Sequence, residues 1–116
     1  MRFLEKEGYI LDTKTYIHWS KDNAGMMSWE EAITSAPKGW RLPTIAELLS
    51  IVNHVKGQPV TELPNMLSDY YSYGHWSATT YENRTDYATI FDFDFRQQDI
   101  RKKSCTCFVR YIESNI

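Results

Sequence analysis

The chain has 116 residues, of which 13 are Lys or Arg and 15 are Asp or Glu, so its formal net charge at pH 7 is -2. This length suits one domain with one hydrophobic core, and we expect residues 1–116 to form a single domain. The small negative charge gives no general reason to bind nucleic acid or an anionic membrane. Aromatic residues make up 15% of the chain, a high share for a globular domain.

The amino terminus carries charges where a secretory signal needs an apolar run, at Arg2, Glu5 and Lys6. No stretch of the sequence approaches the length of a membrane span. Cys105 and Cys107 stand two residues apart, a spacing that places them poorly for a mutual disulfide. We therefore expect a cytoplasmic protein of a bacterial host, with an extracellular or virion-surface location as the alternative.

Two short β-prone runs open the chain, at residues 8–11 and 16–19. The polar residues 12–15 between them predict a β-hairpin. Residues 20–25 are polar and predict a loop. Both strands should be short.

A helix is predicted to begin after Ser28, because Glu31 stands three residues later and completes a capping box. Its apolar face is expected to consist of Trp29, Ala32 and Ile33. Residues 37–39 should end this helix.

A second helix is predicted after Thr44, where Glu47 completes another capping box and Pro43 keeps the preceding chain extended. Its apolar face should contain Ile45, Leu48, Leu49 and Val52. In the extended residues before it, alternation points Trp40 and Leu42 to one side and Arg41 to the other.

Further strands are predicted at residues 76–81, 87–95 and 105–112. In the second of these, Phe91, Phe93 and Phe95 alternate with Asp92 and Asp94. Intervening segments should be a surface loop at 54–66, a turn at 82–86 and a charged hairpin loop at 97–104. In the last strand, Cys105, Cys107, Val109 and Tyr111 should share one face, and Phe108, Arg110 and Ile112 the other. This order of elements predicts an α+β domain with a mainly antiparallel sheet.

Several segments resemble one family in the same order along nearly the whole chain. They are Asp12–Trp19, Met27–Ala32, Gly39–Leu48, Trp76–Tyr81 and Val109–Arg110. The most specific is Trp40-Arg41-Leu42-Pro43-Thr44 followed by a Glu-Leu helix. The chain resembles the Lcl C-terminal domain family, named for the C-terminal domain of the Legionella collagen-like protein.

The resemblance implies a C-type-lectin-like fold, in the branch that includes the formylglycine-generating enzymes. By that likeness, two flanking α-helices and long loops should accompany a twisted, mainly antiparallel sheet, and the terminal strands should pair with each other. Members of the family resemble binding modules. Since one fold serves many functions, the site has to be argued from its residues.

No catalytic or metal-binding signature is apparent, so we expect a protein that is not an enzyme and uses no cofactor. The nearest likeness to a calcium-lectin loop is Gln58-Pro59-Val60, which lacks the required oxygens. Cys105 and Cys107 read as strand packing more simply than as a copper site. His18, His54 and His75 lack a zinc-ligand spacing.

Two arginines, Arg41 and Arg110, stand between apolar neighbours in extended segments. A guanidinium in such a place needs carbonyl or carboxylate acceptors, so both should be internal links between elements. The complete set that we expect to be structural is Trp29, Trp40, Arg41, Leu42, Thr44, Glu47, Trp76 and Arg110.

A surface rich in tyrosine and charge is the best candidate for binding a partner, because aromatic residues and arginine dominate protein interfaces. Acidic neighbours make nucleic acid an unfavourable partner for the basic residues of this surface. We expect a non-enzymatic recognition module that acts inside the cell, where it binds and modulates or inhibits a host protein, as a phage or mobile-element protein would. The alternative is a glycan-binding adhesin or tail-fibre domain. The predicted partner-binding residues are Tyr70, Tyr71, Tyr73, His75, Tyr81, Glu82, Arg84, Asp92, Asp94, Arg101 and Lys102. Stoichiometry and oligomeric state do not follow from the sequence.

Overall fold

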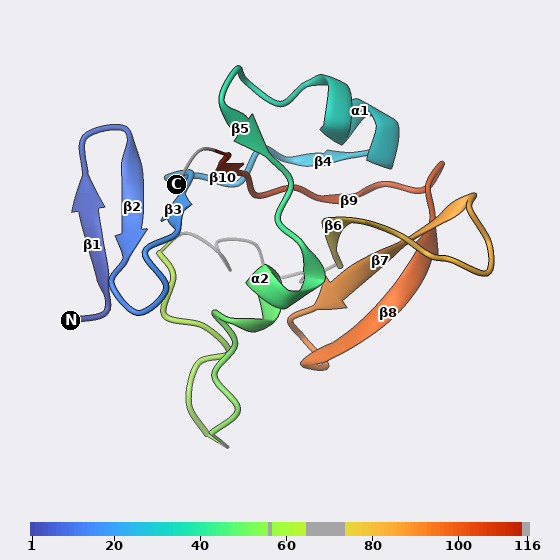
Figure 1. Ribbon diagram of the computed structural model, residues 1–116. Helices are drawn as coiled ribbons and strands as arrows, with labels where there is room; N and C mark the ends of the chain where they lie inside the picture. The colour runs from blue at the N-terminus through green and yellow to red at the C-terminus, as the bar shows by residue number, and fades with distance from the viewer. Residues whose placement is uncertain (56, 65–73, 115–116) are drawn as a thin grey trace.

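The computed structural model describes residues 1–55, 57–64 and 74–114. These residues form an α+β domain of two sheets and two short helices (Figure 1). The described strand pairs are antiparallel except for β6 with β9, so the predicted class of a mainly antiparallel α+β domain is confirmed.

The first sheet contains the predicted hairpin, now seen as two antiparallel strands, together with an additional amino-terminal strand. Its strands, in spatial order, are β1 (Phe3–Lys6), β2 (Tyr9–Asp12), β3 (His18–Trp19), β10 (Ile112–Glu113) and β5 (Trp40–Arg41). Strand β1 was missed because its charged half, Glu5 and Lys6, is exposed at the edge of the sheet and gives no apolar run.

The second sheet holds the three longest strands of the described chain in an antiparallel arrangement, β6–β7–β8. Its strands, in spatial order, are β4 (Met26–Met27), β9 (Cys107–Phe108), β6 (His75–Thr80), β7 (Tyr87–Asp92) and β8 (Gln97–Lys102). In Figure 1 the β1–β2 hairpin and the β7–β8 hairpin lie on opposite sides of the view, with α2 between them.

Among the described residues, the first and last strands do not pair with each other, contrary to the expectation. Strand β1 pairs with β2, whereas β10 pairs with β3 and β5. The predicted last strand, residues 105–112, also divides into β9 and β10, and these belong to different sheets. The carboxy-terminal segment therefore enters the interior of both sheets.

Both predicted helices are present, as α1 (Trp29–Thr34) and α2 (Ile45–Leu49), and both capping boxes are confirmed. The predicted apolar faces were partly wrong, because Ile33 and Leu49 are 43% and 38% exposed. Ile51 is buried instead, just beyond the end of α2. Helices of five and six residues are too short for a sustained amphipathic stripe, so the following turn supplies the buried side chain.

Two clusters of buried side chains form the core. One contains Phe3, Ile10, Trp19, Leu48, Ile51, Val60, Leu63, Phe91, Phe93 and Ile112, and the other contains Ala32, Leu42, Trp76, Ala88, Ile90, Cys107, Val109 and Tyr111. In β7, Ile90 belongs to the second cluster and the next residue, Phe91, to the first. In segment 107–112, Cys107, Val109 and Tyr111 belong to the second cluster, as their predicted common face requires, and Ile112 belongs to the first.

The β7–β8 turn differs from the prediction. Asp92 Oδ1 accepts hydrogen bonds from the N–H groups of Asp94 and Phe95, at 2.9 and 3.3 Å, and so ends the strand. Phe93 is 1% exposed but Phe95 is 74% exposed. The predicted loop at 97–104 is wrong for most of its length, because residues 97–102 form β8.

Arginines attach the segment 50–64 to the rest of the domain through its carbonyl groups. Arg2 donates to the Ser50 carbonyl at 2.6 Å. Arg96 donates to those of Asn53, Val55 and Gln58 at 2.9, 3.4 and 2.7 Å, and Arg110 to that of Pro64 at 3.0 Å. Val60 and Leu63, which lie in the surface loop predicted at 54–66, are buried in the first core cluster.

Candidate functional site

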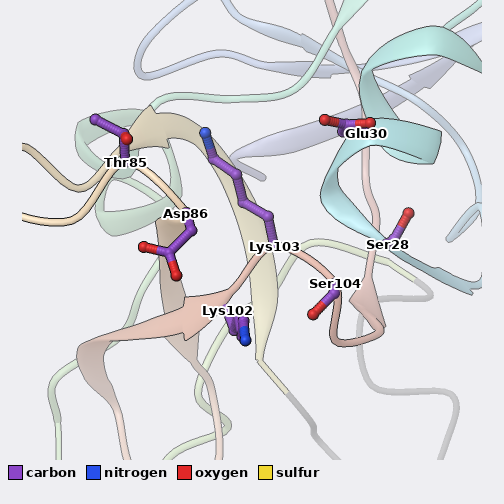
Figure 2. A pocket seen from close by; sticks show the side chains of 7 residues that line it. All are labelled: Ser28, Glu30, Thr85, Asp86, Lys102, Lys103 and Ser104. Carbon is purple, nitrogen blue, oxygen red and sulfur yellow. The ribbon is translucent and has the colours of Figure 1, made fainter.

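A hollow of about 560 Å³ lies between the start of α1 and the β7–β8 hairpin (Figure 2). Its walls come from three places: the amino-terminal end of α1, the residues leading into β7, and the end of β8 with the residues after it. The lining residues are Ser28, Glu30, Thr85, Asp86, Lys102, Lys103 and Ser104.

Backbone hydrogen bonds of Lys103 join the three walls of the hollow. Its carbonyl accepts from the Trp29 N–H at 3.0 Å, and its own N–H donates to the Asp86 carbonyl at 2.8 Å. The Lys103 ammonium also lies 4.1 Å from the centre of the Trp29 ring, a cation–π contact. Trp29 in turn donates its indole N–H to the Ser77 carbonyl at 3.0 Å, which fixes the ring against β6.

The hollow presents polar groups of every kind. Three hydroxyls, two carboxylates and two ammonium groups line it. In Figure 2 the Lys103 side chain extends between Asp86 and Thr85 on one side and Glu30 and Ser28 on the other. Carboxylates accept hydrogen bonds, ammonium groups donate them and hydroxyls do both, so the site can match a ligand that carries many hydroxyls.

Arg84 directly precedes the lining residues Thr85 and Asp86 in the sequence and contacts two neighbours. Its guanidinium carbon lies 4.6 Å from the centre of the Tyr87 ring, and its Nη2 lies 3.8 Å from Asp86 Oδ2. Both charged side chains of this pair are more than half exposed. The pair contributes little to stability and remains available to a ligand.

The structure brings five of the predicted partner-binding residues to this end of the hairpin. Tyr81, Glu82 and Arg84 lie in the β6–β7 connection, and the register places Lys102 opposite Tyr87 and Arg101 opposite Ala88.

Of the predicted partner-binding residues that the structure describes, only Lys102 lines the hollow itself. Asp92 and Asp94 lie at the other end of the β7–β8 hairpin, about 17 Å along the strand. Tyr70, Tyr71 and Tyr73 lie outside the described residues.

His75 was assigned wrongly to the binding surface. Its side chain is 1% exposed, and its ring centre lies 5.0 Å from that of Phe93 and 5.5 Å from that of Phe108. Its Nε2 is 3.3 Å from Asn23 Nδ2. His75 was predicted to belong to the loop surface before a strand at 76–81, but it is the first residue of β6, whose first three residues are all buried.

The site residues that sequence reasoning missed are Ser28, Glu30, Thr85, Asp86, Lys103 and Ser104. The sequence identified Ser28 as a helix cap, which places Glu30 in the first helical turn. It gave no signal that this turn faces the end of β8, because that contact joins residues more than 70 positions apart. Its key bond runs from Trp29 to the backbone of Lys103.

The residues predicted to be structural make contacts inside the domain. Trp76 is fully buried and donates to the Met27 carbonyl at 2.8 Å. Arg41 forms a two-bond ion pair with Glu47, at 2.8 and 3.0 Å, and also donates to the Leu42 carbonyl. Burial tends to raise the pKa of Glu47, but the hydrogen bonds from Arg41 and Thr44 outweigh it and lower the pKa below its ordinary value.

Arg110 is the largest fully buried charged side chain among the described residues. It is 0% exposed and donates to the carbonyls of Ser20, Lys21 and Pro64 at 2.7, 3.0 and 3.0 Å. Burial lowers the pKa of its guanidinium to about 10, with Asp22 acting in the opposite direction, so the group stays charged at neutral pH.

Within residues 1–55, 57–64 and 74–114, no group of three or more His, Cys, Asp or Glu side chains is arranged to hold a metal ion. Cys107 is buried and Cys105 is exposed, and both are free thiols. Burial raises the pKa of the Cys107 thiol to about 11, which makes it a poor nucleophile and ligand. No helix in the described part of the chain is long and apolar enough to cross a membrane.

Fold and site together define a small α+β domain with a polar surface hollow. The family model of the Lcl C-terminal domain matches residues 8–113, so the chain belongs to this family. No curated protein and no solved structure matches the chain at a significant level.

Proposed function

We propose that this domain is a non-enzymatic recognition module of the adhesin type, which binds a glycan in the hollow between α1 and the β7–β8 hairpin. Membership of the Lcl C-terminal domain family suggests an extracellular or adhesin-like module. A C-type-lectin-like classification of the fold is part of the same proposal.

The observation that carries the proposal is the lining of the hollow. Its volume of about 560 Å³ lies within the range of small-molecule sites. Its seven lining residues all carry a polar group and their carbon atoms form the rest of its surface, whereas small-molecule sites in general are lined mainly by hydrophobic and aromatic side chains. A saccharide offers several hydroxyls that both donate and accept, so it can satisfy Asp86, Glu30 and the two lysines together.

The proposed contacts are direct hydrogen bonds. Asp86 and Glu30 would accept from sugar hydroxyls, and Lys102 and Lys103 would donate to ring or hydroxyl oxygens. Hydrogen bonds to charged groups are stronger than neutral ones, and losing one leaves the sugar hydroxyl unpaired. Each carboxylate should therefore matter measurably for affinity.

A glycan array followed by NMR titration of the best ligand tests this function. We expect Asp86→Asn to weaken binding about tenfold or more, because the amide that replaces the carboxylate forms weaker bonds. Glu7→Gln is the matched control, since it makes the same change at an exposed turn beside β1. A glycan that binds the wild type and the Asp86→Asn variant equally would contradict the site.

A protein partner is the second candidate, and a specific observation favours it. Phe95 is 74% exposed at the tip of the β7–β8 hairpin, where Asp92 caps the turn and Arg96 binds three carbonyls. An exposed aromatic side chain on a held turn is a typical anchor of a protein interface. A cytoplasmic protein that inhibits a host factor, including one encoded by a phage, would use such a tip.

The two candidates predict opposite results for one pair of variants. Phe95→Ser should abolish capture of a purified protein partner and leave glycan binding unchanged. Asp86→Asn should do the reverse. If neither variant changes the binding of any identified ligand, both candidates fail.

A further inference from the structure

Strand β8 is an edge of the second sheet. Among the described strands it pairs with β7 and stands at the end of the spatial order. Figure 1 shows it on the outer side of the β6–β7–β8 layer. Six residues pair on its inner side, from Gln97 to Lys102, which makes it long enough to accept another strand on its outer side.

We propose that β8 pairs antiparallel with β8 of a second copy of this chain, with Ile100 on the twofold axis. This inference does not depend on the ligand proposed above. We infer a second copy as the partner from the sequence of β8, Gln-Gln-Asp-Ile-Arg-Lys. When two such strands pair antiparallel in one particular register, opposite charges face each other.

Backbone geometry limits the choice of register. Alternate residues of an edge strand direct their N–H and C=O groups outward, so hydrogen-bonded pairs between two copies join residues of the same parity. A twofold axis must then pass through a residue. Near the middle of β8 the possible centres are Asp99, Ile100 and Arg101.

Charge selects among these three registers. Centring on Asp99 or on Arg101 places two like charges directly opposite each other, which is destabilising. Centring on Ile100 places Asp99 opposite Arg101 of the second copy, twice by symmetry. It also places the two isoleucines opposite each other, an apolar cross-strand pair.

A contact at the same position supports this register. Asp99 Oδ1 accepts a hydrogen bond from the N–H of Ile100 at 2.8 Å. We take this N–H to be one of the outward groups, covered by its neighbour's carboxylate in the single chain. In the dimer the N–H would bond the Ile100 carbonyl of the second copy, and the released carboxylate would bind Arg101.

The other long edge of the domain does not have this property. In β1, centring a self-pair on Glu5 places two carboxylates opposite each other, and centring it on Leu4 places Phe3 opposite Glu5. Neither register gives an opposite-charge pair. The self-complementarity of β8 is therefore a property of its sequence and not of edge strands in general.

Sedimentation equilibrium over a wide range of protein concentration tests the proposal. The pairing runs from Gln98 to Lys102 in each copy, so we expect a weak dimer that forms as concentration rises. Arg101→Asp should weaken it about tenfold, because two attractive pairs become two repulsive ones. Asp99→Arg should do the same.

The decisive variant carries both changes, Asp99→Arg and Arg101→Asp. It restores opposite charges across the axis, so we expect dimerisation to return to near the wild-type level. Lys38→Asp, at an exposed position outside the strands, makes the same charge change as Arg101→Asp and should leave the dimer unchanged. Circular dichroism of each variant confirms that it is folded.

Two results would overturn the proposal. One is a wild type that remains monomeric at millimolar concentration. The other is a dimer that Arg101→Asp leaves intact, or that the double variant fails to restore, since either would place the contact elsewhere. Amide exchange at Ile100 gives an independent check, because its N–H should become more protected as the dimer forms.

Discussion

Two regions of this domain use the same kinds of charged residue in opposite ways. Around segment 50–64, the guanidinium groups of Arg96 and Arg110 are occupied by backbone carbonyls, and that of Arg2 by the Asp12 carboxylate and the Ser50 carbonyl. At the hollow beside β8, Arg84 and Lys102 belong to a solvent-facing surface with few fixed partners. A charged side chain near an irregular segment can therefore be structural or can be free to bind a ligand. Its hydrogen-bond acceptors show which of the two roles it has.

The largest expected difference in stability is between substitutions of the two phenylalanines of the β7–β8 turn. Phe93→Ala should destabilise the domain by about 4 kcal/mol, because it empties a site in the first core cluster. Phe95→Ala should change the free energy of unfolding by less than about 0.5 kcal/mol, since its side chain is in water. Urea unfolding of both variants measures the difference; equal losses would mean that Phe95 is packed in solution.

The next effect concerns the buried arginine. Arg110→Met should cost about 3 kcal/mol, because it leaves three carbonyls in the interior without their donor. Arg101→Met is the matched control on β8, and there we expect a change of less than about 0.5 kcal/mol. Urea unfolding at low protein concentration keeps any dimer out of the measurement. A near-neutral Arg110→Met would show that water can replace the guanidinium.

The smallest effect expected is a pH dependence at Glu47. Its pKa in the folded state lies below the unfolded value, so its contribution to stability is present above the unfolded pKa and is lost as pH falls through the folded pKa. Glu47→Gln should remove about 1 kcal/mol at pH 7. Below the folded pKa the two proteins should converge in stability.

The pKa of Asp12 is also lowered. Burial raises this pKa, but the hydrogen bonds from Arg2, Lys14 and Thr15 lower it by more. Some acid sensitivity therefore remains in the Glu47→Gln variant. Thermal unfolding from pH 7 to pH 3 follows both contributions, and parallel curves for variant and wild type would contradict the role given to Glu47.

Features fixed by neighbours in the sequence could be predicted. The capping boxes at Ser28 and Thr44 depend on a residue three positions away, and the β6–β7 turn depends on a polar run. The end of β7 at Asp92 is also determined by neighbouring residues, but the alternating phenylalanines led to the prediction of a longer strand. There the side-chain hydrogen bonds of Asp92 end the strand in spite of the alternation.

Features fixed by distant contacts could not be predicted. The hollow exists because the backbone of Lys103 forms hydrogen bonds with both Trp29 and Asp86. The local sequence around each of these residues does not predict that they meet. The burial of His75 likewise depends on Phe93 and Phe108. The sequence placed Arg84 and Lys102 among the exposed candidates correctly, but their meeting at one end of the hairpin is a result of the register.

The position of β10 between β3 and β5 has a consequence for the order in which the protein can fold during synthesis. Strands β3 and β5 leave the ribosome long before residues 112–113, which lie between them in the sheet. Likewise β9 joins β4 to β6. Neither sheet can close until β9 and β10 have emerged, so this domain should fold only after residue 113 has been synthesised, in a slow step dominated by contacts distant in sequence.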